Sequence, residues 1–296
     1  MKGFEDSRSP SGAKRLSDTF KPLLRHLRDV AHSMRGVKVG ATAFRLPLGL
    51  TVRVEELWMR EAIARLLPDT EGIFLDIGVN LGQTLLSLRS VDRSRRYIGF
   101  EPNADCVSAV RRIIHENSIE HSTVIPAACS GKFGISRLFH YTNSRFDTTG
   151  SMVPQYRDAA HCRSEAIIVQ ASVRDCLESL EVDRLGLVKI DVEGFEADVL
   201  EALELMIAKD GPPILIEVLP IRESAERQAA ADRIVRFISR LNYAVFRIDK
   251  DDLGRFVGFT RQDRIGSQIA VEESDFLLCL TSSAHAADQG PCGMCE

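Results

Sequence analysis

The chain has 296 residues, of which 44% are apolar and 27% are charged, a composition typical of globular proteins. This length allows one or two domains with a large core. The net charge of −4 provides no basic field, so we expect no nucleic-acid partner. No apolar run reaches the roughly 18 residues that cross a bilayer, and the first residues lack the apolar centre of a signal peptide.

The N-terminal region differs from the rest in charge, because its first 40 residues contain nine Lys or Arg against four Asp or Glu. Residues 1–15 are rich in Ser, Gly and Pro and are predicted to form a disordered tail. Apolar residues at helical spacing then predict an amphipathic helix from Leu16 to Met34. A basic helix of this kind is able to lie on an anionic membrane surface. Docking on the protein's own core is far more common, and we favour it.

Seven cysteines are scattered along the chain, an odd number that fits reduced thiols in a cytoplasmic protein better than a disulfide framework. Two of them, Cys292 and Cys295, form a pair near the C-terminus. A structural zinc site needs four ligands, and the nearby sequence offers no second pair. We therefore interpret residues 283–296 as a flexible tail with two free thiols.

The order of the expected elements predicts a three-layer α/β fold. The segment TAFRLPLGLTVRV has β-like runs around Pro47 and Gly49, which predict a hairpin, and a helix ending at Pro68 follows. Beyond Gly72, strands alternate with helices, which predicts right-handed βαβ units in a mostly parallel, Rossmann-like sheet of about seven strands. Residues 131–172 break this pattern, and we expect an inserted strand, a loop and a returning strand. The strand-like runs of the sheet are IFLD, RYIGFE, STVIPAA, GLVKID, PILIEVL, YAVFRI and DFLLCL.

Carboxylates end four of the predicted strands, at Asp76, Glu101, Asp191 and Glu217. The carboxyl ends of parallel strands meet at one edge of a sheet, and ligands bind in the crevice there. One such acid would be an ordinary cap or ion pair. Four of them on core strands predict a shared site.

A glycine loop, Gly78-x-Asn80-x-Gly82, follows the first of these strands and opens a helix. Glycines permit positive φ angles and the close approach of a ligand to the backbone, and a helix N-terminus offers free amides. Glu101, at the end of the second strand, is placed to accept hydrogen bonds from ribose hydroxyls. The first half of the fold is therefore predicted to bind an adenosine.

The loop favours S-adenosylmethionine over a dinucleotide. The dinucleotide fingerprint has a glycine where this chain has Asn80, whose side chain would crowd a pyrophosphate. Asp76, just before the loop, would repel a pyrophosphate but attract an ammonium or a sulfonium. S-adenosylmethionine carries both of these cations. An NAD(P)-dependent oxidoreductase is the first alternative.

Five motifs resemble the FkbM family of S-adenosylmethionine-dependent methyltransferases: LDIGVNLG, GFEPN, AACSGKFG, VKIDVEGFEADVLEA and PPILIEV, within residues 73–218. The resemblance implies a class I methyltransferase domain, over residues 71–282, after a helix-and-hairpin extension over residues 16–70. It implies methyl transfer to a hydroxyl of a sugar or other small molecule. The family often has an acid where this chain has Gly131, and Ser130 is the substitute available. The implied cofactor-binding residues are Asp76, Gly78, Asn80, Gly82, Glu101, Asn103 and Ser130.

The run KIDVEGFE provides the candidate catalytic residues Asp191 and Glu193, joined by Glu217 on the next strand. A carboxylate here is able to take the proton of an acceptor hydroxyl. Asp191 and Glu217 are also able to hold a divalent cation such as Mg²⁺. The structural alternative is that Asp191 and Glu193 cap the next helix and pair with Lys189.

Two histidines, His140 and His161, flank the irregular region and are weaker candidates for a general base. A scaffold that binds S-adenosylmethionine without catalysis is the second alternative to an O-methyltransferase. Because Asp191, Glu193 and Glu217 are all retained, we favour the enzyme.

Overall fold

The computed structural model of the chain describes residues 36–47, 50–52, 56–154, 156, 161–221, 224–265 and 271–282. The helix predicted over residues 16–34, the tails over 1–15 and 283–296, and the pair Cys292 and Cys295 lie outside these residues. No helix within the described part of the chain has the length and apolarity that a membrane span requires.

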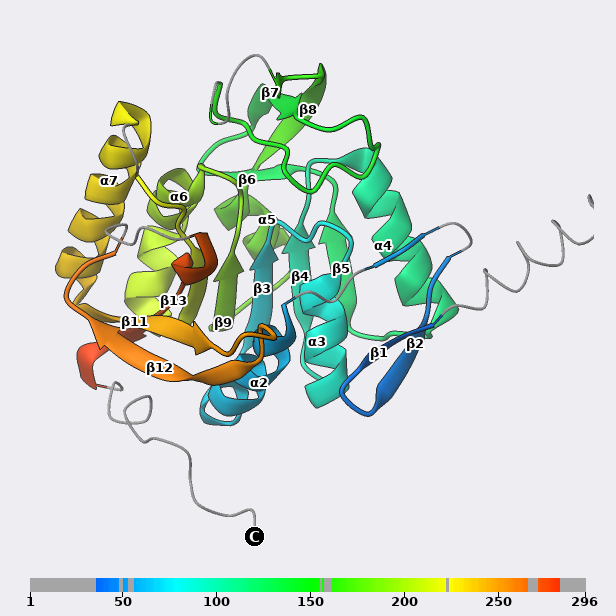
Figure 1. The fold of residues 1–296 in the computed structure, drawn as a ribbon, viewed down its shortest axis with the longest axis horizontal. Helices are drawn as coiled ribbons and strands as arrows, with labels where there is room; N and C mark the ends of the chain where they lie inside the picture. Colours follow the sequence, from blue (N-terminus) through cyan, green and yellow to red (C-terminus); the bar gives the residue numbers. More distant parts are fainter. Residues whose placement is uncertain are drawn as a thin grey trace, which may run out of the picture.

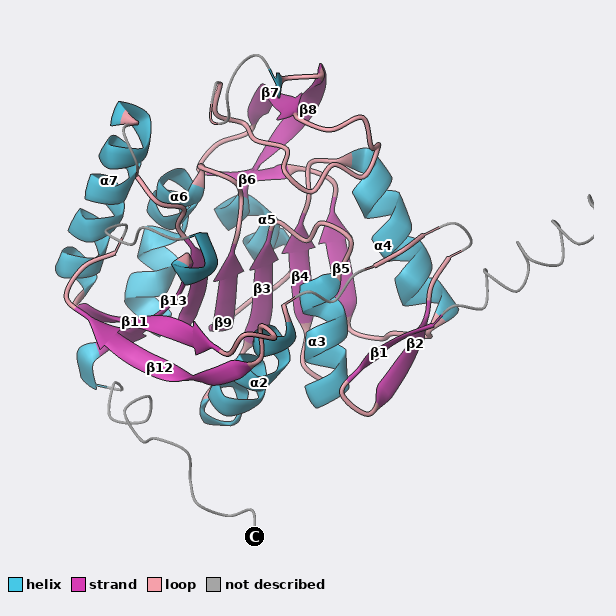
Figure 2. Ribbon diagram, in the orientation of Figure 1, coloured by secondary structure: helices cyan, strands magenta, loops and turns pink. Residues whose placement is uncertain are grey.

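A central sheet forms the middle layer of the fold (Figures 1 and 2). Its strands are β3 (Ile73–Ile77), β4 (Tyr97–Phe100), β5 (Ser122–Ile125), β9 (Leu185–Ile190), β10 (Ile214–Glu217), β11 (Tyr243–Lys250), β12 (Phe256–Gln262) and β13 (Asp275–Leu280). Their order is β12-β11-β13-β10-β9-β3-β4-β5. All run in one direction except β12 and β13. This confirms the predicted mostly parallel sheet. The sequence did not predict β12, which adds one edge strand.

Helices cover both faces of this sheet. They are α2 (Leu57–Leu66), α3 (Gln83–Val91), α4 (Ala104–Glu116), α5 (Val173–Ser179), α6 (Glu196–Asp210) and α7 (Ala225–Leu241). Helices α2, α3 and α4 pack on the face that carries Phe74 and Leu187, and α5, α6 and α7 pack on the face that carries Leu75 and Val188. Successive residues of one strand thus enter opposite cores, which is the two-residue period of a strand buried on both sides.

A second sheet stands at the carboxyl ends of the central strands. It consists of β6 (Ala128–Ser130), β7 (Gly134–His140) and β8 (Ser164–Ser172), in the order β6-β8-β7. Strands β7 and β8 pair antiparallel, which confirms the predicted inserted and returning strands. In Figure 1 the arrows of β9, β3, β4 and β5 point towards this sheet. It therefore overhangs the edge where the ligand crevice was predicted.

The hairpin of the N-terminal region lies earlier in the chain than predicted. Strands β1 (Gly36–Val39) and β2 (Thr42–Arg45) pair antiparallel, with the turn at Gly40 and Ala41 and not around Pro47. Gly40 has a φ of 58°, which suits a two-residue hairpin turn. A turn does occur at Pro47, whose carbonyl accepts from Leu50 N at 3.0 Å. It does not join two paired strands of the described chain. The helix predicted to end at Pro68 is confirmed by α2 and a 3₁₀ turn over Leu67–Asp69.

Gly78 lies just beyond β3, next to β9, at the point where the strand order reverses, and its φ is 90°. A Cβ on Gly78 would lie 1.9 Å from the carbonyl oxygen of Asp191. The glycine loop predicted the close approach of a ligand at this residue. The structure shows that the close contact between the ends of β3 and β9 already requires it.

We expect Gly78→Ala to lower the free energy of unfolding by at least about 2 kcal/mol, because the clash involves backbone and the φ is left-handed. Gly258→Ala is the matched control, since no atom lies within 4 Å of its added Cβ. The control should change stability by no more than about 0.5 kcal/mol. Urea denaturation measures both, and a Gly78→Ala protein as stable as its control would contradict this account.

Candidate functional site

The Glu101 carboxylate connects the loop after β3 to the end of β4. Its Oε2 accepts from Asn80 N at 2.8 Å, and its Oε1 accepts from Asn103 N at 2.8 Å. Asn103 in turn caps α4 by accepting from Asp105 N at 3.0 Å. Burial raises the pKa of Glu101 to about 7. Each carboxylate oxygen can accept a further hydrogen bond, so Glu101 is equipped to bind ligand hydroxyls.

Lys189, on β9, places an ammonium group between the ends of β3 and β9. Its side chain is 6% exposed, and Nζ donates to Gly78 O at 3.0 Å and to Asp191 Oδ2 at 3.1 Å. The Oδ1 of Asp76 lies 3.7 Å from the same Nζ. Burial alone would lower the pKa of Lys189, but the charges of Asp191 and Asp76 outweigh it and raise that pKa. Lys189 is therefore a permanent cation that fixes the loop and Asp191 together.

Asp76 lies behind Lys189 and is fully buried. Its Oδ2 accepts from the hydroxyl of Tyr97 at 2.6 Å, and burial raises its pKa to about 6. Among the described residues, the cation beside Asp76 is the ammonium of Lys189, and the contact of Asp76 with a ligand cation stays a prediction.

Asp191 and Glu217, at the ends of β9 and β10, form a carboxylate pair. Burial, the charge of Asp191 and a hydrogen bond between the two side chains raise the pKa of Glu217 well above its usual value. These effects favour the protonated form of Glu217, which donates a hydrogen bond to Asp191. Within the described residues, no group of three or more His, Cys, Asp or Glu side chains could hold a metal ion. The cation beside Asp191 is the ammonium of Lys189.

A glutamate within helix α6 stabilises the turn that precedes the helix. Its N-cap is Phe195, which makes no side-chain cap hydrogen bond. The Oε1 of Glu196 satisfies the turn instead, since it accepts from Val192 N at 3.3 Å and from Gly194 N at 2.9 Å. The structural alternative for Asp191 was a helix cap and an ion pair with Lys189. For Asp191, only the ion pair is confirmed.

Two cavities meet at the loop after β3. The first cavity reaches towards β4 and the second sheet, and the second cavity, of ≈ 580 Å³, reaches towards α2 and β10. The residues that line both are Gly78, Asn80, Thr148, Asp191 and Glu193. The first is also lined by Phe100, Glu101, Asn103, Cys129, Leu138, Asp147 and Phe195. The second is also lined by Thr51, Glu56, Gln83, Thr84, Lys189 and Glu217.

Three predicted residues do not line these cavities. Asp76 lies behind Lys189, Gly82 forms the left-handed N-cap of α3, and the Ser130 hydroxyl accepts from Lys132 N at 3.4 Å. The structure brings the other predicted residues together around the two cavities. Glu56, which precedes α2, also lines the second cavity. It was not predicted as a site residue because no local motif marks it. The predicted site residues that line a cavity are Gly78, Asn80, Glu101, Asn103, Asp191, Glu193 and Glu217.

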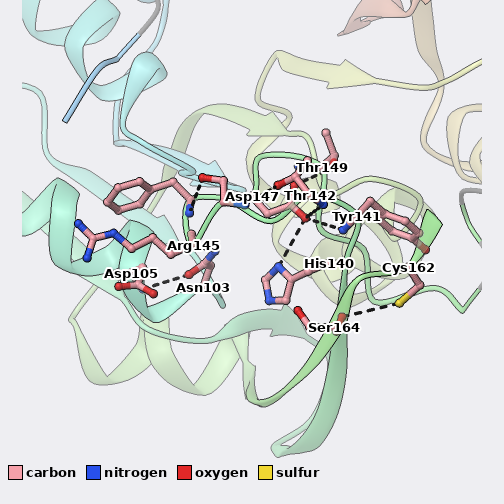
Figure 3. Close-up of polar contacts among 12 residues, drawn as sticks. Asn103, Asp105, His140, Tyr141, Thr142, Arg145, Asp147, Thr149, Cys162 and Ser164 are labelled. Carbon is pink, nitrogen blue, oxygen red and sulfur yellow. Dashed lines mark hydrogen bonds and ion pairs between the residues drawn. The ribbon is translucent and has the colours of Figure 1, made fainter. Parts of the chain in front are cut away.

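His140, the last residue of β7, contacts Asp147 in the loop that follows (Figure 3). It lines neither cavity. Its Nδ1 lies 3.6 Å from Asp147 Oδ2, an ion pair when His140 is protonated. The same Oδ2 accepts from Tyr141 N at 2.6 Å and from Thr142 N at 3.1 Å. Burial alone would raise the pKa of Asp147, but hydrogen bonds, those from Thr149 foremost, outweigh it and lower that pKa. Neither His140 nor His161 lines the cavities, so the structure does not bring them to the site.

The strand order, with an antiparallel β13 beside β10 and a glycine loop after β3, defines a class I methyltransferase fold. The crevice lies at the reversal of that order, between β3 and β9. Residues 76–245 match the sequence profile of the methyltransferase FkbM domain. The chain belongs to the FkbM methyltransferase family.

Solved structures of methyltransferases resemble the fold. Methyltransferase FkbM from Methylobacillus flagellatus KT is 14% identical, with a TM-score of 0.42 over 77% of this chain and 56% of that one. The O-methyltransferase from Bacillus cereus in complex with SAH is 10% identical, with a TM-score of 0.43 over 90% of this chain and 92% of that one. The chain thus spans little more than half of the M. flagellatus protein. A search of curated proteins gave no match. The family assignment rests on the sequence profile.

The buried Glu196 should make stability depend on pH. Its folded-state pKa of about 7 lies above the usual 4.5 because of burial, so the free energy of unfolding falls as the pH rises between these values. Glu196→Gln keeps the Oε1 acceptor but removes the titration. We expect the loss of stability between pH 4.5 and pH 8 to shrink in this variant by up to about 3 kcal/mol. Urea denaturation at the two pH values measures it, and equal losses in both proteins would contradict the assignment.

Proposed function

We propose that the protein transfers a methyl group from S-adenosylmethionine to a hydroxyl oxygen of a sugar or another small molecule. The observation that carries the proposal is the meeting of the two cavities at Asp191 and Asn80. One side offers apolar walls and the Glu101 carboxylate, which suit an adenosine. The other side is rich in carboxylates, which suit cationic groups. A ligand with both parts would match the chemistry of the two sides.

The chemistry of the second cavity supports a cationic donor. Its ionisable residues are Lys189 and four acids, Glu56, Asp191, Glu193 and Glu217. The amide oxygens of Asn80 and Gln83 are buried and have no hydrogen-bond partner among the described residues. An ammonium group provides the donors that such oxygens lack. When bound, S-adenosylmethionine supplies a methyl group on a positively charged sulfur.

The residues of this chain would act mainly by positioning. Lys189 fixes Asp191 at the junction of the cavities. Holding the acceptor oxygen in line with the methyl group removes much of the entropic barrier to displacement. The ammonium of Lys189 already neutralises Asp191, so the proposal includes no Mg²⁺.

The rival dinucleotide chemistry is disfavoured by the same charges. A pyrophosphate in the second cavity would face Asp191 and Glu193 with only Lys189 to offset them. An NAD(P)-dependent oxidoreductase would need more hydrogen-bond donors in the second cavity to bind the pyrophosphate. The excess of negative charge in the second cavity therefore supports the sulfonium donor over NAD(P).

We expect Glu101→Gln to weaken binding of S-adenosylhomocysteine at least tenfold, because charged hydrogen bonds to ligand hydroxyls contribute roughly 1.5–3 kcal/mol each. Isothermal titration calorimetry measures the affinity, and circular dichroism verifies the fold. Glu120→Gln is the control, since Glu120 is an exposed glutamate ahead of β5, with a side chain that is 83% exposed. If both variants bind like the wild type, Glu101 is not a cofactor residue.

The proposed function is tested by a screen for methyl acceptors. Sugars, catechols and other hydroxylated metabolites are incubated with the protein and S-adenosylmethionine labelled on the methyl, with and without EDTA. Mass spectrometry should find a labelled methyl on oxygen, with a rate that EDTA leaves unchanged. S-adenosylhomocysteine, and not NADH, should raise the melting temperature. Stabilisation by NADH alone, or transfer only to nitrogen or carbon, would overturn the proposal.

A further inference from the structure

Glu56 reaches the site from outside the family domain. It directly precedes α2, whose Trp58 and Met59 are buried in the core and fix the start of the helix. Glu56 occupies the N-cap position but makes no side-chain cap hydrogen bond. It lines the second cavity together with Lys189, Asp191 and Glu217. The side chain is therefore available for a ligand in that cavity.

Glu56 also borders a third cavity, of ≈ 600 Å³, on the other side. That cavity is lined by Trp58 and by residues of β11, including Arg247 and Lys250, and by Asp275 at the start of β13. Glu56 thus forms part of the wall between the methyl-transfer site and a space large enough for a sugar-sized molecule. An acceptor entering from the third cavity would pass this carboxylate before it reached Asp191.

The other acids of the second cavity are already engaged. Asp191 is paired with Lys189 at 3.1 Å, Glu217 is hydrogen-bonded to Asp191, and Glu193 has an interaction of its own. At the edge of the third cavity, Asp275 is paired with Lys250. No hydrogen bond or ion pair to the Glu56 carboxylate occurs among the described residues. Of these acids, Glu56 is the one that is free to take up a proton.

The surroundings of Glu56 shift its pKa towards neutral pH, which suits proton uptake. Burial raises its pKa to about 7, with further contributions from the positive charges of Lys189 and Lys250, which lower it, and from Asp191 and Asp275, which raise it. A base with a pKa near the working pH is present in its ionised form and also holds the proton it receives. The neighbouring charges come from β9, β11 and β13, so the tuning depends on the assembled fold.

We propose that Glu56 is the general base that accepts the proton of the acceptor hydroxyl. The inference rests on the proposed function and deepens it. The O–H bond breaks as the new O–C bond forms, and the proton passes to the Glu56 carboxylate. The C–S bond breaks, and its electron pair stays on sulfur, which becomes a neutral thioether. The acceptor lies between the second and third cavities, whose acids favour a neutral or cationic hydroxyl compound over an anionic one.

The test uses Glu56→Gln in the full chain, with Glu61→Gln as the matched control. Glu61 is on the same helix, and its side chain is 51% exposed beside Arg60. With a hydroxyl acceptor found in the screen, kcat should fall 10²–10⁴-fold in Glu56→Gln. The rise of the wild-type rate through about pH 7 should disappear. The acceptor KM and the calorimetric affinity for S-adenosylhomocysteine should stay within threefold of wild type. The control should match wild type throughout.

A second readout needs no acceptor. In protein labelled with ¹³C at the glutamate carboxyls, one resonance titrating near pH 7 should be missing from Glu56→Gln. If that variant does not fold, Glu56→Asp should keep the ionisation but lower kcat at least tenfold. Unchanged turnover in either variant, or titration of Glu56 in the ordinary glutamate range, would overturn the proposal.

Two further outcomes distinguish a general base from a cofactor-binding role of Glu56, and a failure of this inference from a failure of the proposed function. A tenfold loss of affinity for S-adenosylhomocysteine with unchanged kcat in Glu56→Gln would show that Glu56 binds the methionine ammonium, and would overturn the base. A wild type that methylates no hydroxyl counts against the proposed function. An active wild type with an equally active Glu56→Gln counts against Glu56 alone.

Discussion

The ammonium of Lys189 is the interaction on which the rest of the site depends. A buried charge is costly unless it is paired and hydrogen-bonded, and Lys189 meets this demand with Asp191, Asp76 and the carbonyl of Gly78. These contacts bind the end of β9 to the loop after β3. The same loop is held to β4 by Glu101. Removing one member would leave a desolvated charge inside the sheet, so the geometry of the crevice and the stability of the fold are linked.

The ionisation states around Lys189 also bear on catalysis. An enzyme gains rate only from interactions that are stronger in the transition state than in the ground state. A cavity with four ionised acids would hold a sulfonium too firmly in the ground state. Lys189 neutralises Asp191, and the raised pKa of Glu217 favours its protonated form. The cavity is thereby acidic enough to attract a cationic donor without opposing the loss of its charge.

The sequence predicted the acids at the strand ends because topology alone brings such positions together. Glu101, Asp191 and Glu217 line the cavities as expected. Asp76 differs because it lies one residue before the end of β3, on the face that Phe74 shares, and the strand's alternation turns it towards Tyr97. Local spacing does not reveal this, since a shift of one residue reverses the face. The hairpin was misplaced for a related reason, because turn residues at Pro47 do not by themselves specify strand pairing.

Helix α2, which precedes the first family motif, is an integral part of the fold. It packs against α3 and β12 and shares a core cluster with the central strands, so it belongs to the helical layer of the sheet. The family profile begins at residue 76 and does not include Glu56 or Trp58. The motifs that define the family contain the residues proposed to hold the donor, whereas these two residues border the space proposed for the acceptor. Under this proposal, proteins that share every motif can differ in acceptor, because the residues beside the acceptor lie in a segment that the family profile does not include.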